Sequence, residues 1–251
     1  MTPRFWIPPE LLRGPGVLAL SPEAAHHASR VLRLQSGDAI EVFDGAGRSA
    51  NAHILELARD QCRVQIGALA DAPKARPGAT ITLMQGVAAA DRMDWIVEKS
   101  IELGVTQIIP VLCQRSVVKL DEDRSKKRHQ HWQRIAVAAC MQCGQNWLPT
   151  ITAPLPARTA FAQATANAAA RLILDPGATS SFSQLVRARS ESPEPESWIL
   201  AVGPEAGFDP GELAAARQAG FQAVQLGPRV LRTETAGAAA LASLQTLLGL
   251  F

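Results

Sequence analysis

The chain has 251 residues, of which 47% are hydrophobic and 19% are charged, and its formal net charge is +2. This balance excludes an intrinsically disordered protein, and the length allows two domains with buried cores. No apolar run reaches the ~18 residues of a membrane helix, and Pro3, Pro8 and Pro9 interrupt the region where a signal peptide would be apolar. We therefore expect a cytoplasmic protein that has no membrane partner.

Short segments that alternate apolar and polar residues dominate the amino-terminal part of the chain. Residues 39–43, 52–57 and 62–66 follow this pattern between Gly, Asp and Asn residues, which predicts a small β-barrel or sandwich. Residues 44–50 fit a G-x-G-x-x-A nucleotide-binding pattern, but the segment that follows alternates like a strand where that motif requires a helix. We therefore interpret Asp44-Gly45 as a hairpin turn.

Residues 72–78 contain two prolines and a glycine and show no periodicity. We place a domain boundary there, between a domain of residues 1–72 and a domain of residues 78–251. In the second domain, apolar segments alternate with helical ones, which predicts an α/β fold with a largely parallel sheet. The expected strands are residues 79–85, 107–112, 171–174, 198–202 and 223–226, and the clearest helix covers residues 91–103 and ends at Gly104.

The cysteines and the local charge are weaker indications of function. Cys140 and Cys143 form the one close cysteine pair, and without a second pair we predict no metal site. Between Cys113 and Arg134 there are seven basic and three acidic residues. Such an excess could follow RNA phosphates, but a solvated helix face is the commoner explanation of such a run taken alone, and both interpretations stay open.

Two glycine-bearing turns near the carboxyl terminus each follow a predicted strand. The first is Val202-Gly203-Pro204-Glu205-Ala206-Gly207-Phe208, and the second is Leu226-Gly227-Pro228-Arg229-Val230-Leu231-Arg232-Thr233-Glu234-Thr235-Ala236. Turns at the carboxyl ends of neighbouring parallel strands face one crevice, and glycines let their backbone approach an adenine or a ribose. We expect Thr233 to be the N-cap of the last helix. By composition alone, two ordinary loops explain the pattern equally well.

These two motifs closely resemble the paired signature of the 16S rRNA uracil-N3 methyltransferases, which are members of the SPOUT superfamily. The resemblance extends over nearly the whole chain. Arg4-Phe5, His27 with Val31-Leu32-Arg33, and residues 37–47 look like that family's PUA-like RNA-binding domain. Residues 91–104 resemble its first catalytic helix. The resemblance implies an α/β fold with a trefoil-knotted parallel-sheet domain, preceded by a small PUA-like β-barrel. It also implies S-adenosylmethionine as cofactor, 16S rRNA or the small ribosomal subunit as partner, and a homodimer. The small residues 236–240 would suit close packing across that dimer or, equally, within one subunit.

The resemblance assigns roles to individual positions. The cofactor pocket becomes Leu174, Val202, Gly203, Pro204, Glu205, Ala206, Gly207, Leu226, Gly227, Val230, Leu231 and Ala236. The implied reaction centre has Arg232, with Arg229 as its alternative, and Glu234; either arginine could instead pair with Glu205 or Glu234. The candidates for RNA phosphate contacts are Arg4, Arg30, Arg33, Arg92, Arg115 and Lys119. Ala206 stands where the family usually has Gly, and Met141 and Gln145 replace usual charges.

Uracil N3 carries a weakly acidic proton, and its anion spreads charge onto O2 and O4. A guanidinium beside those oxygens would lower the barrier, and we assign this role to Arg232 as a hypothesis. Two other functions remain open. The first is a related knotted methyltransferase that modifies a ribose 2′-OH or another base, and the second is a non-catalytic protein that binds RNA or assists ribosome assembly.

Overall fold

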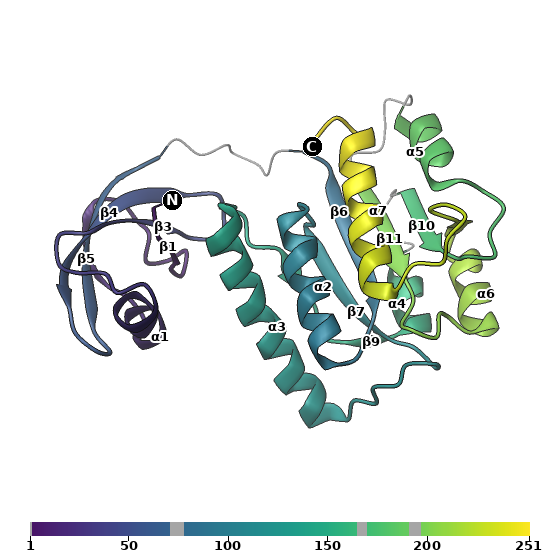
Figure 1. Ribbon diagram of the computed structural model, residues 1–251, viewed down its shortest axis with the longest axis horizontal. Helices are drawn as coiled ribbons and strands as arrows, with labels where there is room; N and C mark the ends of the chain where they lie inside the picture. Colours follow the sequence, from purple (N-terminus) through teal and green to yellow (C-terminus); the bar gives the residue numbers. More distant parts are fainter. Residues whose placement is uncertain (1, 71–77, 165–169, 191–196) are drawn as a thin grey trace. The chain divides into compact units, whose positions relative to one another are not determined.

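The computed structural model describes residues 2–70, 78–164, 170–190 and 197–251 (Figure 1). It divides into two compact units, one of Met1–Pro77 with Val137–Leu148 and one of Gly78–Ala136 with Pro149–Phe251. The segment in which we expect the domain boundary lies outside the described residues, except for Gly78. Within the described part of the chain, no helix is both long enough and apolar enough to cross a membrane.

A mixed five-stranded sheet forms the first unit, as the alternating segments predict. Its strands follow the order β1-β3-β4-β5-β2, with β1 parallel to β3 and the other three pairs antiparallel. Their bounds are β1 (Arg4–Trp6), β2 (Gly16–Ala19), β3 (Ala39–Phe43), β4 (Ser49–Leu57) and β5 (Cys62–Leu69), and helix α1 (Pro22–His26) continues into the π-helix η1 (His27–Val31). Apolar side chains from alternate strand positions, such as Ile40, Val42, Ile54 and Val64, form the core.

The connection between β3 and β4 is a hairpin turn, as we interpret Asp44-Gly45 from the sequence. The Asp44 N–H donates to the Arg48 carbonyl (3.1 Å), and Gly45 and Gly47 have φ of +74° and +101°, which favour glycine. A Cβ on Gly47 would lie 2.5 Å from the Trp147 ring. These glycines therefore serve a tight turn against an aromatic ring, and no helix follows them to bind a nucleotide.

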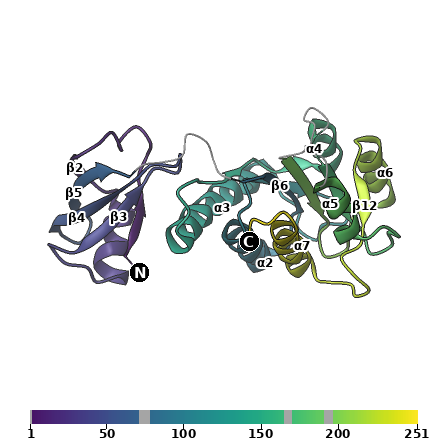
Figure 2. The same ribbon diagram turned by 90° about the horizontal axis from the view of Figure 1, so that it is seen from above.

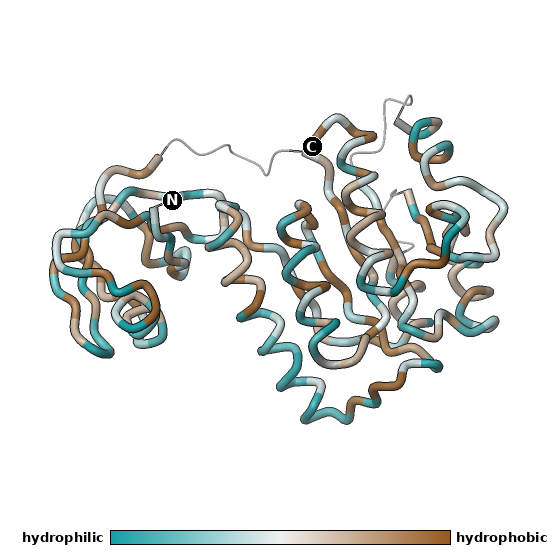
Figure 3. The backbone as a smooth tube through the Cα atoms, viewed as in Figure 1, coloured by the Kyte–Doolittle hydropathy of each residue, from teal (hydrophilic) through white to brown (hydrophobic). Residues whose placement is uncertain are grey.

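The sequence did not show that the end of helix α3 (Glu122–Cys143) belongs to the first unit. The hydrophilic part of α3 precedes its apolar end, which Figure 3 shows as a change from teal to brown. Met141 packs against the core of the first unit, and the Leu148 N–H donates to the Gly45 carbonyl (2.8 Å). Cys140 is buried and Cys143 is exposed, and no described group of three His, Cys, Asp or Glu residues could hold a metal ion.

A seven-stranded parallel sheet forms the second unit and confirms the predicted α/β class. Its order is β12-β10-β11-β6-β7-β8, with β9 also paired to β7. Each expected strand is present to within three residues at either end. The bounds are β6 (Thr80–Gly86), β7 (Gln107–Leu112), β8 (Thr150–Ile151), β9 (Leu155–Pro156), β10 (Ala170–Leu174), β11 (Ser197–Val202) and β12 (Gln222–Val224).

Helices cover both faces of this sheet (Figure 2). On one face, α2 (Ala90–Glu102) packs beside α7 (Thr233–Leu247), which also contacts α5 (Phe182–Ser190). On the other face, α4 (Ala157–Gln163) packs beside α6 (Pro210–Gln218) over a core that contains Phe161 and Phe208. Gly104, with φ of +79°, follows the last residues of α2 and ends it as expected.

Candidate functional site

A cavity of about 730 Å³ lies where β10, β11 and β12 end at their carboxyl termini. Open parallel sheets bind ligands at this edge, because successive strand-to-helix loops converge there. Residues 202–208 form what we call the first wall, and residues 226–232 form the second wall. The lining includes all twelve expected cofactor residues and all three expected reaction-centre residues: Leu174, Val202, Gly203, Pro204, Glu205, Ala206, Gly207, Leu226, Gly227, Arg229, Val230, Leu231, Arg232, Glu234 and Ala236.

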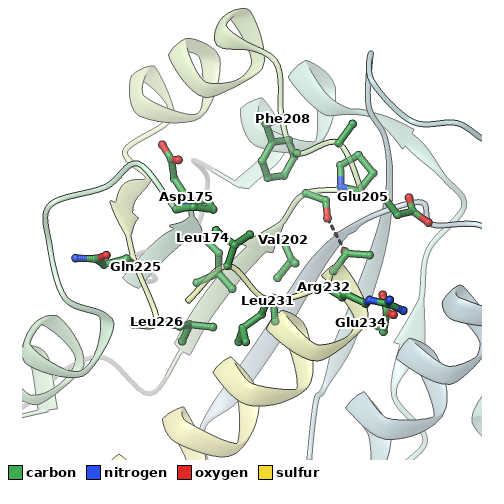
Figure 4. Close-up of a pocket in the computed structure, with 18 of the residues that line it drawn as sticks. Leu174, Asp175, Val202, Glu205, Phe208, Gln225, Leu226, Leu231, Arg232 and Glu234 are labelled. Atoms are coloured by element: carbon green, nitrogen blue, oxygen red, sulfur yellow. Dashed lines mark hydrogen bonds between the residues drawn. The ribbon is translucent and has the colours of Figure 1, made fainter. Parts of the chain in front are cut away.

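The centre of the cavity is apolar and its rim is polar (Figure 4). Leu174, Val202, Leu226 and Leu231 gather in the middle, whereas Asp175 and Gln225 lie on one side and Arg232 and Glu234 on the other. An apolar centre with a few polar groups around it is the usual form of a small-molecule site. Asp175 and Gln225 are not among the expected site residues, although each directly follows the end of a strand at this edge.

The first wall is held against β6 by a close backbone approach. A Cβ on Gly86, the last residue of β6, would lie 2.5 Å from Pro204 Cδ and 2.8 Å from the Gly203 carbonyl carbon. The Gly207 N–H donates to the Pro204 carbonyl (2.8 Å), and Gly207 has φ of +68°. The first wall therefore folds as a tight turn, and it can lie this close to β6 only because residue 86 is a glycine.

Glu205 ties the first wall to the amino terminus of α2. Its Oε1 accepts hydrogen bonds from the Ala89 N–H (3.0 Å) and from Arg92 Nη1 (2.9 Å). Ala89 is the N-cap of α2 and provides no capping side chain itself, so a carboxylate from another loop satisfies this helix end. Burial alone would raise the pKa of Glu205, but the Ala89 N–H, its own N–H and Arg92 together lower it.

Thr233 corrects one expectation from the sequence. The N-cap of α7 is Arg232, which makes no side-chain capping bond, and Thr233 is the first helical residue. The Thr233 hydroxyl donates to the Gly203 carbonyl (2.6 Å) and accepts from Gln85 Nε2 (2.9 Å). It therefore joins α7 to the first wall and does not cap its own helix.

The second wall is exposed at residues 227–230. The side chain of Val230 is 78% exposed, and between described residues no hydrogen bond involves residues 226–231. Within the same described ranges, Arg229 and Arg232 form no ion pair, either with Glu205 or with Glu234. Glu234 Oε2 is buried and has no hydrogen-bond partner. Charged groups at this end of the cavity are thus free to meet a ligand.

The structure separates the six candidates for RNA contact. Arg92 and Arg115 line the cavity, and Lys119 lies on the loop after Arg115, with Nζ donating to the Gln114 carbonyl (3.1 Å). Arg30 and Arg33 are exposed on the first unit. Arg33 has φ of +55°, the one described non-glycine residue with positive φ.

Arg4 is placed differently from what a phosphate contact requires. It is 7% exposed, its Nε lies 3.1 Å from Glu41 Oε2, and its guanidinium stacks on the Phe43 ring at 4.7 Å. It also donates to the Asn146 side chain. Since these partners lie within the first unit and the side chain is buried among them, Arg4 holds that unit together, and we do not retain it among the RNA candidates.

The chain is similar to known methyltransferases over most of its length. Residues 75–245 match the RNA methyltransferase domain, and residues 20–67 match the RNA methyltransferase PUA domain. A ribosomal RNA small subunit methyltransferase E from Buchnera aphidicola is 30% identical over 233 residues, which cover 92% of this chain and 88% of that protein.

Two solved structures cover 98% of this chain and 98% of their own. One is a ribosomal RNA small subunit methyltransferase E from Neisseria gonorrhoeae bound to S-adenosylmethionine, with 34% identity and a TM-score of 0.86. The other is a methyltransferase from Legionella pneumophila in complex with the same cofactor, with 34% identity and a TM-score of 0.88.

These similarities confirm the family that the paired glycine motifs indicate, and with it a parallel-sheet domain preceded by a PUA-like domain. The trefoil knot and the homodimer stay predictions. The chain belongs to the RNA methyltransferase family that includes the ribosomal RNA small subunit methyltransferase E proteins.

Proposed function

We propose that this protein transfers the methyl group of S-adenosylmethionine to N3 of a uridine in 16S rRNA. The observation that carries the proposal is the convergence of all twelve expected cofactor residues on one cavity at the carboxyl edge of the sheet. Further parts of the proposal are a cytoplasmic location, a homodimer with knotted catalytic domains, and 16S rRNA or the small ribosomal subunit as partner. We propose that residues 1–72 serve RNA binding and residues 78–251 serve catalysis.

The cavity fits S-adenosylmethionine in size and in chemistry. Its volume of about 730 Å³ lies within the usual range for small-molecule sites, ~300–1,000 Å³. Leu174, Val202, Leu226 and Leu231 offer an apolar place for an adenine ring (Figure 4). Gly203, Gly207 and Gly227 leave backbone accessible for hydrogen bonds to adenosine.

The cofactor supplies a methyl group that is already electrophilic because it is bonded to a sulfonium. The residues of the chain therefore have to align donor and acceptor, exclude water and stabilise charge on the acceptor. Arg232 lies at the α7 end of the cavity (Figure 4), where its guanidinium would stabilise the uracil anion through O2 or O4, with Arg229 next along the wall. Glu234, with its unpartnered oxygen, lies beside Arg232.

Arg115 adds positive charge at the cavity, where Arg92 also lies with one of its nitrogens paired to Glu205, and Lys119 lies on the same loop as Arg115. Together with Arg30 and Arg33 on the first unit, they are the proposed phosphate contacts. If these residues act together, RNA affinity falls steeply as the salt concentration rises. Replacing Arg30 alone with Ala should then reduce the slope of that dependence by about one unit.

Mass spectrometry of modified nucleosides tests the proposed reaction. Small-subunit rRNA and assembled subunits, both from a strain that lacks the protein, are incubated with the enzyme and S-adenosylmethionine. The expected product is 3-methyluridine, and 2′-O-methyluridine or another methylated base would instead identify a related methyltransferase. Calorimetry with the cofactor addresses the non-catalytic alternative, because a scaffold with an inactive pocket gives no binding heat.

A further inference from the structure

A buried hydrogen-bond chain joins three separate parts of the second unit, and two of its members, Gly203 and Thr233, line the cavity. Gln85, at the end of β6, is 0% exposed, and its Nε2 donates to the Gly86 carbonyl (3.0 Å) and to Thr233 Oγ1 (2.9 Å). Thr233 Oγ1 in turn donates to the Gly203 carbonyl (2.6 Å). One side chain thus connects the central strand, the start of α7 and the first wall.

The direction of each bond in this chain is determined by its partners. The Gly203 carbonyl can only accept, so the single hydroxyl hydrogen of Thr233 is committed to it, and Thr233 Oγ1 must receive its other bond from a donor. The Gly86 carbonyl can also only accept. Both amide hydrogens of Gln85 are therefore in use, and the amide cannot be turned around without losing two bonds.

This arrangement leaves the oxygen of the Gln85 amide in an unfavourable position. Its Oε1 is buried without a hydrogen-bond partner, and a Cβ on Gly237 would lie 3.4 Å from it. A buried acceptor without a partner is destabilising. Turning the amide to give Oε1 another environment would break the two hydrogen bonds that Nε2 donates to Gly86 and Thr233.

We infer that Gln85 is a positioning residue of the methyl-donor site. Acting through Thr233, it fixes the Gly203–Pro204 peptide of the first wall and the start of α7, which directly follows the second wall. Both walls then keep the spacing that the donor requires. The inference rests on the proposed function, because it takes the cavity to be the methyl-donor site. Gln85 itself does not line the cavity.

The first test is Gln85→Glu, which keeps the size of the side chain and removes both donors. The measurement is calorimetric Kd for S-adenosylmethionine, expressed at each pH as the ratio of variant to wild type. Near about pH 8.5 we expect a ratio on the order of ten, since a buried carboxylate cannot donate. Near about pH 6 the ratio should fall, because burial favours a protonated carboxyl that restores one donor. A ratio of one, or a raised ratio that is independent of pH, would overturn the inference.

A second set of variants does not depend on the folding of Gln85→Glu. Thr233→Ser keeps the hydroxyl and should bind the donor like the wild type, whereas Thr233→Val removes it and should weaken binding on the order of tenfold. Equal affinities for these two variants would contradict the inference. The matched control is Thr82→Val, which removes the bond from Thr82 Oγ1 to Gln107 Oε1 (3.2 Å) elsewhere on β6 and should leave Kd unchanged. If Thr82→Val weakens binding as much as Thr233→Val, general loosening of the sheet explains both and the inference fails.

Failure of the inference and failure of the proposed function give different results. If the wild type shows no binding heat with S-adenosylmethionine, the proposed function is wrong. If the wild type binds and both Gln85→Glu and Thr233→Val bind equally well at all pH values, only the role of Gln85 is wrong.

Discussion

The two walls of the cavity are built in opposite ways. The first wall is fixed to the rest of the unit at three points: Pro204 lies against Gly86, Glu205 binds the start of α2, and the Gly203 carbonyl accepts from Thr233. The second wall has exposed residues from 227 to 230 and makes no hydrogen bond with described residues along 226–231.

This difference indicates a division of labour within one site. A wall held by buried contacts is already in its binding conformation, so a ligand loses little entropy on meeting it. A wall with free backbone groups and exposed side chains opens locally at low free-energy cost. We expect the first wall to set affinity for the methyl donor and the second wall to close over it and carry the chemistry.

The largest expected effect comes from Gly86→Ala, which should displace the first wall from its position against β6. The added methyl group would overlap Pro204 and the Gly203 backbone, so the wall must move, and overpacking of this kind is strongly destabilising. Calorimetry should show Kd for S-adenosylmethionine raised about a hundredfold or more. Gly16→Ala is the control, because a Cβ there meets no atom within 4 Å. Unchanged donor affinity in Gly86→Ala would mean that the first wall is adaptable after all.

Arg232→Ala should lower kcat on the order of a hundredfold, because it removes the positive charge proposed to stabilise the uracil anion. Donor affinity should stay near that of the wild type, since Arg232 ends the second wall. Single-turnover methylation assays and calorimetry measure the two effects separately. Arg217→Ala, an exposed arginine on α6, provides the control. Full turnover by an Arg232→Ala protein that still binds the cofactor excludes this assignment.

Hydrogen exchange compares the two walls directly in the unmodified protein. On addition of S-adenosylmethionine, amides of residues 226–231 should exchange about tenfold more slowly, because ligand contacts replace their contact with water. Amides of residues 203–207 should change much less. Mass spectrometry of overlapping peptides measures both, and equal protection of the two walls would remove the distinction drawn between them.

Glu205→Gln should have the smallest effect, a rise in donor Kd of about threefold, because the amide oxygen still accepts from Ala89 while the charge at the helix end is lost. The variant also has a pH signature. The pKa of Glu205 is lowered in the folded protein, so its ionised form stabilises the fold at neutral pH, and this contribution disappears as the pH falls through that lowered pKa.

Urea unfolding should therefore show wild type more stable than Glu205→Gln at neutral pH and the two converging in acid. Glu10→Gln, at an exposed position of the first unit, should match the wild type throughout. A stability difference that persists unchanged in acid would argue against an electrostatic role for Glu205.

Much of the second unit was visible in the sequence, because local pattern decides it. Buried parallel strands are rich in apolar residues, and the alternation of apolar segments with helical ones predicts strands at 107–112 and 198–202. The glycines that follow these apolar segments predict the turns after Val202 and before Arg232. A strand end followed by a glycine turn places residues at the ligand-binding edge without knowledge of any distant contact.

Long-range partners were the part that the sequence could not provide. Thr233 is a residue type that often caps a helix, yet its hydroxyl forms hydrogen bonds with Gly203 and Gln85. Arg4 had the appearance of a surface charge, yet it stacks on Phe43 and pairs with Glu41. In each case tertiary partners far along the chain compete with the local preference and win, and periodicity contains no information about such partners.

The close contact between Pro204 and Gly86 has a thermodynamic consequence for the whole second unit. A small molecule that contacts the turn also contacts, through it, the central strand of the sheet, so occupancy and unfolding become linked by mass action. At a ligand concentration of about one hundred times Kd, the free energy of unfolding rises by ~2.7 kcal/mol. The melting temperature of the intact protein therefore serves as a direct reporter for screening analogues of the donor.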